Sequence, residues 1–167
     1  MTSVEYHNYA YHLDIMNLHD DCDVDVTAKF DTGAVVSFFT VSALYTGITN
    51  ETATRLQKSL VSRPNIITAS FNAASGEEMF AVKCHADDVM VGNIHFERFF
   101  YWLNPSVENK KALLGDDFIR FCDFRHKRYN DILIDDFDMD EYMRTHNEDQ
   151  DDKSLSTEEI SEMIFSE

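Results

Sequence analysis

Val26-Thr27-Ala28-Lys29-Phe30-Asp31-Thr32-Gly33-Ala34-Val35-Val36-Ser37-Phe38-Phe39 places one acid in a tight Asp-Thr-Gly turn between two apolar, strand-like segments. Glycine permits a sharp turn because it has no Cβ, and the flanking apolar segments hold the acid at a rigid strand end. A carboxylate activates water efficiently when a second carboxylate shares its proton, because two like charges a few ångströms apart cannot both ionise. The chain supplies one such turn, so the pattern predicts a two-fold dimer in which each subunit contributes Asp31.

Strand-like segments also dominate the rest of the chain. Alternating or short apolar runs bounded by turn residues occur at 9–18, 22–30, 66–71, 79–84 and 94–103. The polar string from Asn72 to Glu78 predicts a long hairpin, and Gly92-Asn93 predicts a second, tighter one. These patterns predict a mostly β domain, closed or sandwich-like, with short helices.

Three further segments have helical or mixed character. Asn50 is expected to cap a helix whose apolar face holds Ala53, Leu56, Leu60 and Val61. Residues 112–121 pass from a strand end into a short helical run. Near the end of the chain, Ser156 and Glu159 form a capping box that predicts a short terminal helix.

The formal net charge of the 167 residues is −17, and the acids are concentrated near the C-terminus. Residues 135–167 hold 13 acids against Arg144 and Lys153. This composition predicts a domain at 1–134 and an acidic, partly disordered tail at 135–167. The negative field is expected to repel nucleic acid, anionic membranes and acidic substrates.

No apolar run is long enough to span a membrane, so a soluble, cytoplasmic protein is expected. Cys22, Cys84 and Cys122 are widely spaced and signal neither a disulfide framework nor a zinc site. The seven histidines lack the paired spacing of metal ligands. We therefore expect no metal and no cofactor.

A second block, Leu113-Leu114-Gly115-Asp116-Asp117-Phe118-Ile119, follows the Asp-Thr-Gly turn by about 80 residues. Together, the two blocks and the hairpin between them resemble the retropepsin-like aspartic proteases, over roughly residues 10 to 135. That resemblance implies a closed β-barrel and a homodimer that hydrolyses extended peptides. In this family the chain termini commonly interleave at the dimer interface.

The resemblance also assigns roles to individual residues. It makes Asp31 the catalytic acid. It implies that Thr32 joins the two active-site loops, while Gly33 and Ala34 shape the floor. The flap that covers substrate corresponds to 69–82, with its substrate-binding tip at Asn72, Ala73, Ala74, Ser75 and Gly76. The structural support behind the site corresponds to Leu114, Gly115, Asp117 and Phe118.

Two other interpretations are compatible with the sequence. The first keeps the fold without the chemistry, as a catalytically weak or inactive peptide-binding or adaptor dimer. The second is a small β-rich adaptor whose acidic tail recruits a basic partner, with an accidental motif match. The hairpin tip carries Glu77 and Glu78 and one glycine, where many retroviral members have several glycines, so its substrate contacts do not follow from the family.

Overall fold

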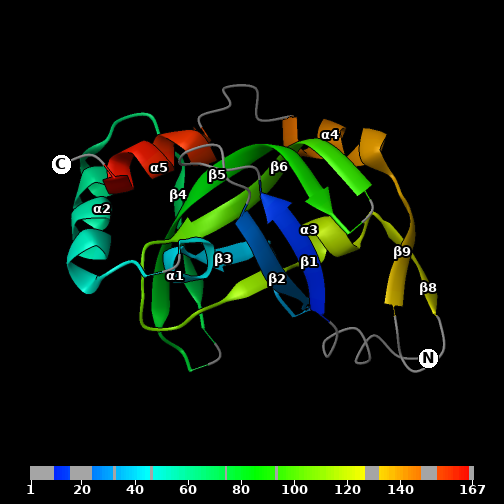
Figure 1. Ribbon diagram of the computed structural model, residues 1–167, viewed down its shortest axis with the longest axis horizontal. Coiled ribbons are helices and arrows are strands. Elements are labelled where there is room, and N and C mark those ends of the chain that lie inside the picture. The colour runs from blue at the N-terminus through cyan, green and yellow to red at the C-terminus, as the bar shows by residue number, and fades with distance from the viewer. Residues whose placement is uncertain are drawn as a thin grey trace.

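The computed structural model describes residues 10–15, 24–31, 33–45, 47–73, 75–92, 94–126, 132–147 and 154–165. Strands form most of its regular structure, and short helices lie around the sheet (Figure 1). The strands are β1 Ala10–Ile15, β2 Val24–Phe30, β3 Phe38–Thr40, β4 Thr68–Asn72, β5 Glu78–Val91, β6 Ile94–Asn104, β7 Ala112–Leu114, β8 Cys122–His126, β9 Ile132–Phe137 and β10 Leu155–Ser156. The helices are α1 Val41–Leu44, α2 Asn50–Ser62, α3 Asp116–Ile119, α4 Met139–Asn147 and α5 Thr157–Phe165.

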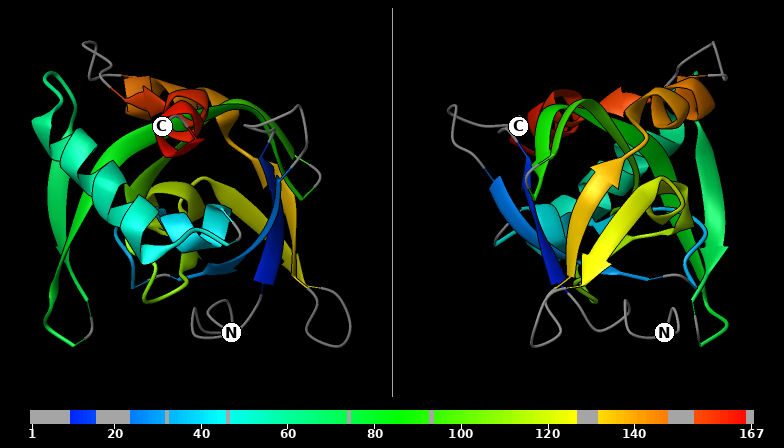
Figure 2. Two further views of the ribbon diagram at one scale, coloured as in Figure 1. Left: turned by 60° about the vertical axis from the view of Figure 1, so that its left-hand side comes forward. Right: turned by 90° about the vertical axis from the view of Figure 1, so that its right-hand side faces the viewer.

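The main sheet has mixed strand directions and the order β1-β2-β7-β3-β6-β5-β10, with β4 pairing to β5. Two residue pairs, Leu13 with Val91 and Asp14 with Met90, also join β1 to β5. β8 and β9 form a separate two-stranded ribbon at one side of the molecule (Figure 2). The structure therefore has the expected mostly β character in mixed sheets, and among the described residues only these two residue pairs join β1 back to β5, short of the closed β-barrel that the resemblance implied.

Both predicted hairpins are present, and they share one long strand. β4 pairs with the start of β5 up to Asn72 and Glu78, and β5 pairs with β6 up to Val91 and Ile94. Gly92 in the second turn has a φ of 61°, a left-handed conformation that glycine adopts without steric cost. The segments 79–84 and 89–91, which look separate in the sequence, are thus parts of the same fourteen-residue β5.

Helix α2 begins one residue earlier than the expected cap implies. Thr49, not Asn50, is the N-cap, because its side-chain oxygen accepts a hydrogen bond from the Thr52 N–H at 3.1 Å. Ala53, Leu56 and Leu60 are buried as predicted, but Val61 is 64% exposed. The helix therefore buries a narrower face than the sequence suggested.

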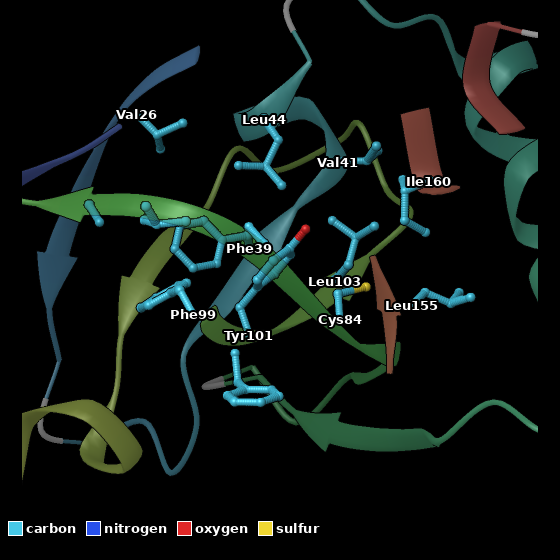
Figure 3. Packing of buried hydrophobic residues seen from close by; sticks show 14 of the residues in the cluster. Val26, Phe39, Val41, Leu44, Cys84, Phe99, Tyr101, Leu103, Leu155 and Ile160 are labelled. Atoms are coloured by element: carbon cyan, nitrogen blue, oxygen red, sulfur yellow. The ribbon is translucent and has the colours of Figure 1, made fainter. Parts of the chain in front are cut away.

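The predicted boundary at residue 135 does not separate a domain from a tail. β9 crosses it, and the hydrophobic core includes residues from the acidic region: Phe137, Tyr142, Leu155, Ile160 and Ile164. Figure 3 shows Leu155 and Ile160 beside Cys84 and Leu103 of the central strands. A highly charged segment stays disordered when it has too few apolar side chains to bury. Here the few apolar side chains of the acidic region are buried in the core, and this burial holds the region in place.

Helix α5 has the expected capping box. The Ser156 N–H donates to Glu159 Oε1 at 3.1 Å, and the Glu159 N–H donates to Ser156 Oγ at 3.0 Å. Before the helix, β10 adds to the edge of β5 in parallel, pairing Leu155 with Cys84. The C-terminal segment is therefore bound to its own chain. Among the described residues, no helix is long and apolar enough to cross a membrane.

Candidate active site

Asp31 directly follows β2 and is held through both its backbone and its side chain. Its N–H donates to the Leu114 carbonyl at 2.9 Å, and its own carbonyl accepts from the Ala34 N–H at 3.1 Å. The Gly33 N–H donates to Asp31 Oδ1 at 2.9 Å. Phe30, the residue before Asp31, is only 1% exposed, so the backbone that leads into Asp31 is anchored in the core. We call Asp31 and residues 33–37 the Asp31 loop.

The block at 113–119, here called the supporting segment, lies directly behind this loop. β7 pairs in parallel with β2, matching Leu114 with Phe30. The Asp116 N–H donates to the Ala34 carbonyl at 2.8 Å. Phe118 is buried in the aromatic core. The two motifs that lie far apart in the sequence therefore form one hydrogen-bonded unit.

Gly115 lets the supporting segment approach the Asp31 loop closely. A Cβ added at Gly115 would lie 2.9 Å from the Ala34 carbonyl oxygen and closer still to the Val36 carbonyl group. These neighbours are backbone atoms, which cannot move aside as a flexible side chain can. Glycine is therefore required at position 115, because any side chain there would collide with the backbone of the Asp31 loop.

Ser37 joins the two segments and was not singled out in the sequence. Its hydroxyl donates to Asp117 Oδ1 at 2.8 Å and accepts from the Gly115 N–H at 3.3 Å, and the residue is 1% exposed. The sequence signal that could have identified Ser37 is its position as the one hydroxyl residue in the apolar run from Val35 to Phe39. A buried polar side chain needs partners, so such a residue indicates a hydrogen-bonded position.

Asp117 lies behind the Asp31 loop, where its carboxylate accepts the hydrogen bond from Ser37. Burial raises the pKa of its carboxyl to about 6, while hydrogen bonds from Ser37 oppose that shift. Nearby Asp116 raises the pKa further, and Arg120 lowers it. The Asp117 carboxyl therefore accepts a proton at mildly acidic pH, with consequences for the stability of the loop.

The hairpin predicted as a flap contacts the rest of the site through its stem. Phe71 packs edge-on against Phe38, with ring centroids 6.0 Å apart, and against Trp102 at 5.3 Å. At the tip, the Ala73 N–H donates to the Glu77 carbonyl and the Gly76 N–H donates to the Ala73 carbonyl, both at 2.8 Å. In Figure 1 the tip and the carboxyl end of β2 both lie toward the lower edge of the molecule.

The structure places the remaining predicted residues as follows. Gly33 is exposed and Ala34 partly buried, while Asn72, Ser75 and Gly76 are exposed on the hairpin. Thr32 and Ala74 lie outside the described residues. Within the described part of the chain, no three His, Cys, Asp or Glu side chains are arranged to hold a metal ion.

The site also includes a set of lysines that sequence reasoning did not connect with Asp31. Lys29, Lys110 and Lys111 line an open hollow of about 560 Å³ together with Asp31. Lys29 lies in β2, and the other two precede β7. The pairing of β2 with β7 brings Lys29 close to Lys110 and Lys111, and the Lys110-Lys111 doublet was the one local signal of this arrangement.

No protein-family model and no curated protein matches this sequence. Among solved structures, the fold is similar to the crystal structure of a retropepsin-like aspartic protease from Rickettsia conorii. The two share 18% sequence identity over 74% of this chain and 78% of that chain, with a TM-score of 0.39.

Proposed function

We propose that this chain is one subunit of a homodimeric, retropepsin-like aspartic endopeptidase in which Asp31 is the catalytic acid. The observation that carries the proposal is the anchoring of Asp31. A partly buried carboxylate lies at a strand end, oriented by the Gly33 N–H and fixed from behind by Leu114. Such preorganisation is what a reacting carboxylate needs.

The proposed reaction uses Asp31 from each of two copies and a water molecule between them. One carboxylate takes a proton from the water, whose oxygen attacks the carbonyl carbon of the substrate peptide bond. The other, protonated carboxyl donates its proton to the carbonyl oxygen, giving a tetrahedral diol. Transfer of a proton to the amide nitrogen then breaks the C–N bond and releases an acid and an amine.

The β4–β5 hairpin is proposed to bind the substrate as a flap. An extended peptide can pair with exposed backbone groups in the manner of an added strand, and closure of the hairpin would exclude water. Asn72, Ala73, Ala74, Ser75 and Gly76 are the proposed contact residues. The stem is already anchored, because Phe71 packs on Phe38 immediately after the Asp31 loop.

The test is to incubate the purified protein with a diverse peptide library and to identify products by mass spectrometry. We expect cleavage by the wild type, none by Asp31→Asn, and unchanged cleavage by Asp140→Asn on the exposed side of α4. Persistent cleavage by Asp31→Asn would rule out the mechanism. Peptide binding by the wild type without cleavage would favour the alternative, an inactive peptide-binding dimer.

A further inference from the structure

The hollow beside Asp31 has a local charge opposite to that of the whole protein. The chain has a formal charge of −17, yet three lysines and one acid line this hollow. Among the described residues, none of Lys29, Lys110 and Lys111 forms an ion pair with a carboxylate. We call this site the lysine hollow.

The fold fixes the backbone from which these side chains extend. Lys29 pairs with Leu113 in the β2–β7 ladder, two residues before Asp31. The Lys111 N–H donates to Thr40 Oγ1, and the Thr40 N–H donates to the Lys111 carbonyl, both at 2.9 Å. Thr40 is 1% exposed, so this anchor belongs to the core. The ammonium groups can move on flexible stems while their points of attachment stay fixed.

We infer that the lysine hollow is a substrate subsite that binds an acidic side chain, aspartate or glutamate, close to the peptide bond presented to Asp31. Its remaining wall includes Leu113 and Ala112, which can contact the apolar stem of a glutamate. Three lysines and one acid line the hollow, so a carboxylate that enters it meets a net positive charge. The role as a protease subsite rests on the proposed function, whereas the preference for acidic peptides in binding does not.

The effect expected is moderate because the lysine side chains reach solvent. Lys29 and Lys110 are exposed, and Lys111 is partly buried. An exposed ion pair changes an equilibrium by up to about fivefold, so two or three together give about tenfold. Salt should weaken the preference, since screening acts strongly on exposed charges.

The experiment uses two fluorescein-labelled octapeptide pools that differ only in a central glutamate or glutamine. Binding is measured by fluorescence anisotropy with the full-length Asp31→Asn protein, which removes cleavage from the measurement. We expect the glutamate pool to bind about tenfold more tightly, and the preference to fall at about 0.5 M salt. In this background, Lys110→Gln with Lys111→Gln should abolish the preference, and Lys58→Gln on α2 should retain it.

Equal affinity for the two pools, or no binding of either up to about 1 mM, would overturn the inference, as would a preference that survives the double substitution. Cleavage of the same two pools by the wild type is measured in parallel, so that a failure of the acidic subsite can be told apart from a failure of the proposed protease activity. Selective binding of the glutamate pool without cleavage overturns the protease and keeps the acidic subsite. Equal cleavage of both pools keeps the protease and overturns the subsite.

Discussion

Gly115 packs so closely against the backbone of the Asp31 loop that there is no room for a side chain. We expect Gly115→Ala to lower the free energy of unfolding by about 3 kcal/mol, because the new methyl group meets the Ala34 and Val36 carbonyl groups. Urea denaturation measures this loss.

Gly76→Ala serves as the comparison for Gly115→Ala. Gly76 has a φ of 90° but open space around its Cβ position, so its substitution costs only backbone strain, about 1 kcal/mol. An equal loss of unfolding free energy in the two variants would show that the close backbone contact at Gly115 does not add to the cost of the substitution.

Asp117 makes the stability of this loop depend on pH. Its pKa is raised to about 6 in the folded protein from the ordinary 3.8, so folding favours the protonated form. The stabilisation is present at low pH and is lost as pH rises through 6, with a change of about 2 kcal/mol between pH 4.5 and 7.5.

The variant Asp117→Asn tests this dependence, because asparagine resembles the protonated acid and does not titrate. The difference in unfolding free energy between wild type and Asp117→Asn should change by about 2 kcal/mol over that pH range, with the wild type gaining at the acidic end. Exposed Asp140→Asn should show no such change. A constant difference for Asp117→Asn would contradict the raised pKa.

At the scale of elements, helix α5 is an integral part of the core. Ile160 is fully buried, and the Thr157 hydroxyl lies 2.7 Å from the Tyr101 hydroxyl and donates to the His85 carbonyl at 2.9 Å. We therefore expect Ile160→Ala to lower the free energy of unfolding by about 3 kcal/mol.

Val61→Ala is the matched control, since Val61 is also an aliphatic residue on a helix but is 64% exposed. Its effect should stay within about 0.5 kcal/mol. Thermal or urea unfolding of both variants makes the comparison, and a neutral Ile160→Ala would mean that α5 is a dispensable appendage.

Local patterns predicted the strands, the hairpins and the cap of α5, because each depends on neighbours in sequence. Asp87 and Asp88 interrupt the apolar pattern of β5, yet the strand continues because Asp87 is exposed and pairs with Arg98. The acidic C-terminal region was misjudged because averaging its composition hides single apolar residues such as Tyr142. The Ser37 bridge and the lysine hollow depend on tertiary pairing, which no local pattern contains.

At the scale of the whole molecule, the proposed chemistry requires two copies of the chain. β10 pairs with β5 of its own subunit, so that edge of β5 is occupied and cannot pair with a strand of a second copy. Val35 of the Asp31 loop is 74% exposed beside the acid that must meet its symmetry mate. This exposed valine is the residue through which we test dimerisation.

We expect Val35→Asp to weaken the dimer by about tenfold or more, because it places an unpaired charge in the contact. Val61→Asp, at a similarly exposed valine on α2, should leave the dimer unchanged. Sedimentation over a range of concentrations measures both. A wild-type protein that stays monomeric at every concentration would contradict the dimer itself.

The docking of β10 and α5 on β5 also affects when the protein can fold during its biosynthesis. β10 and α5 complete the core around Cys84, and they leave the ribosome after every other described element of the chain. We expect nascent chains that end at residue 147 to be digested rapidly by an added protease, and released full-length chains to resist it. Resistance of the shorter chain would show that the core closes earlier. Under this order of events, a nascent chain that has not yet reached α5 has no folded subunit with which to form the proposed Asp31 pair.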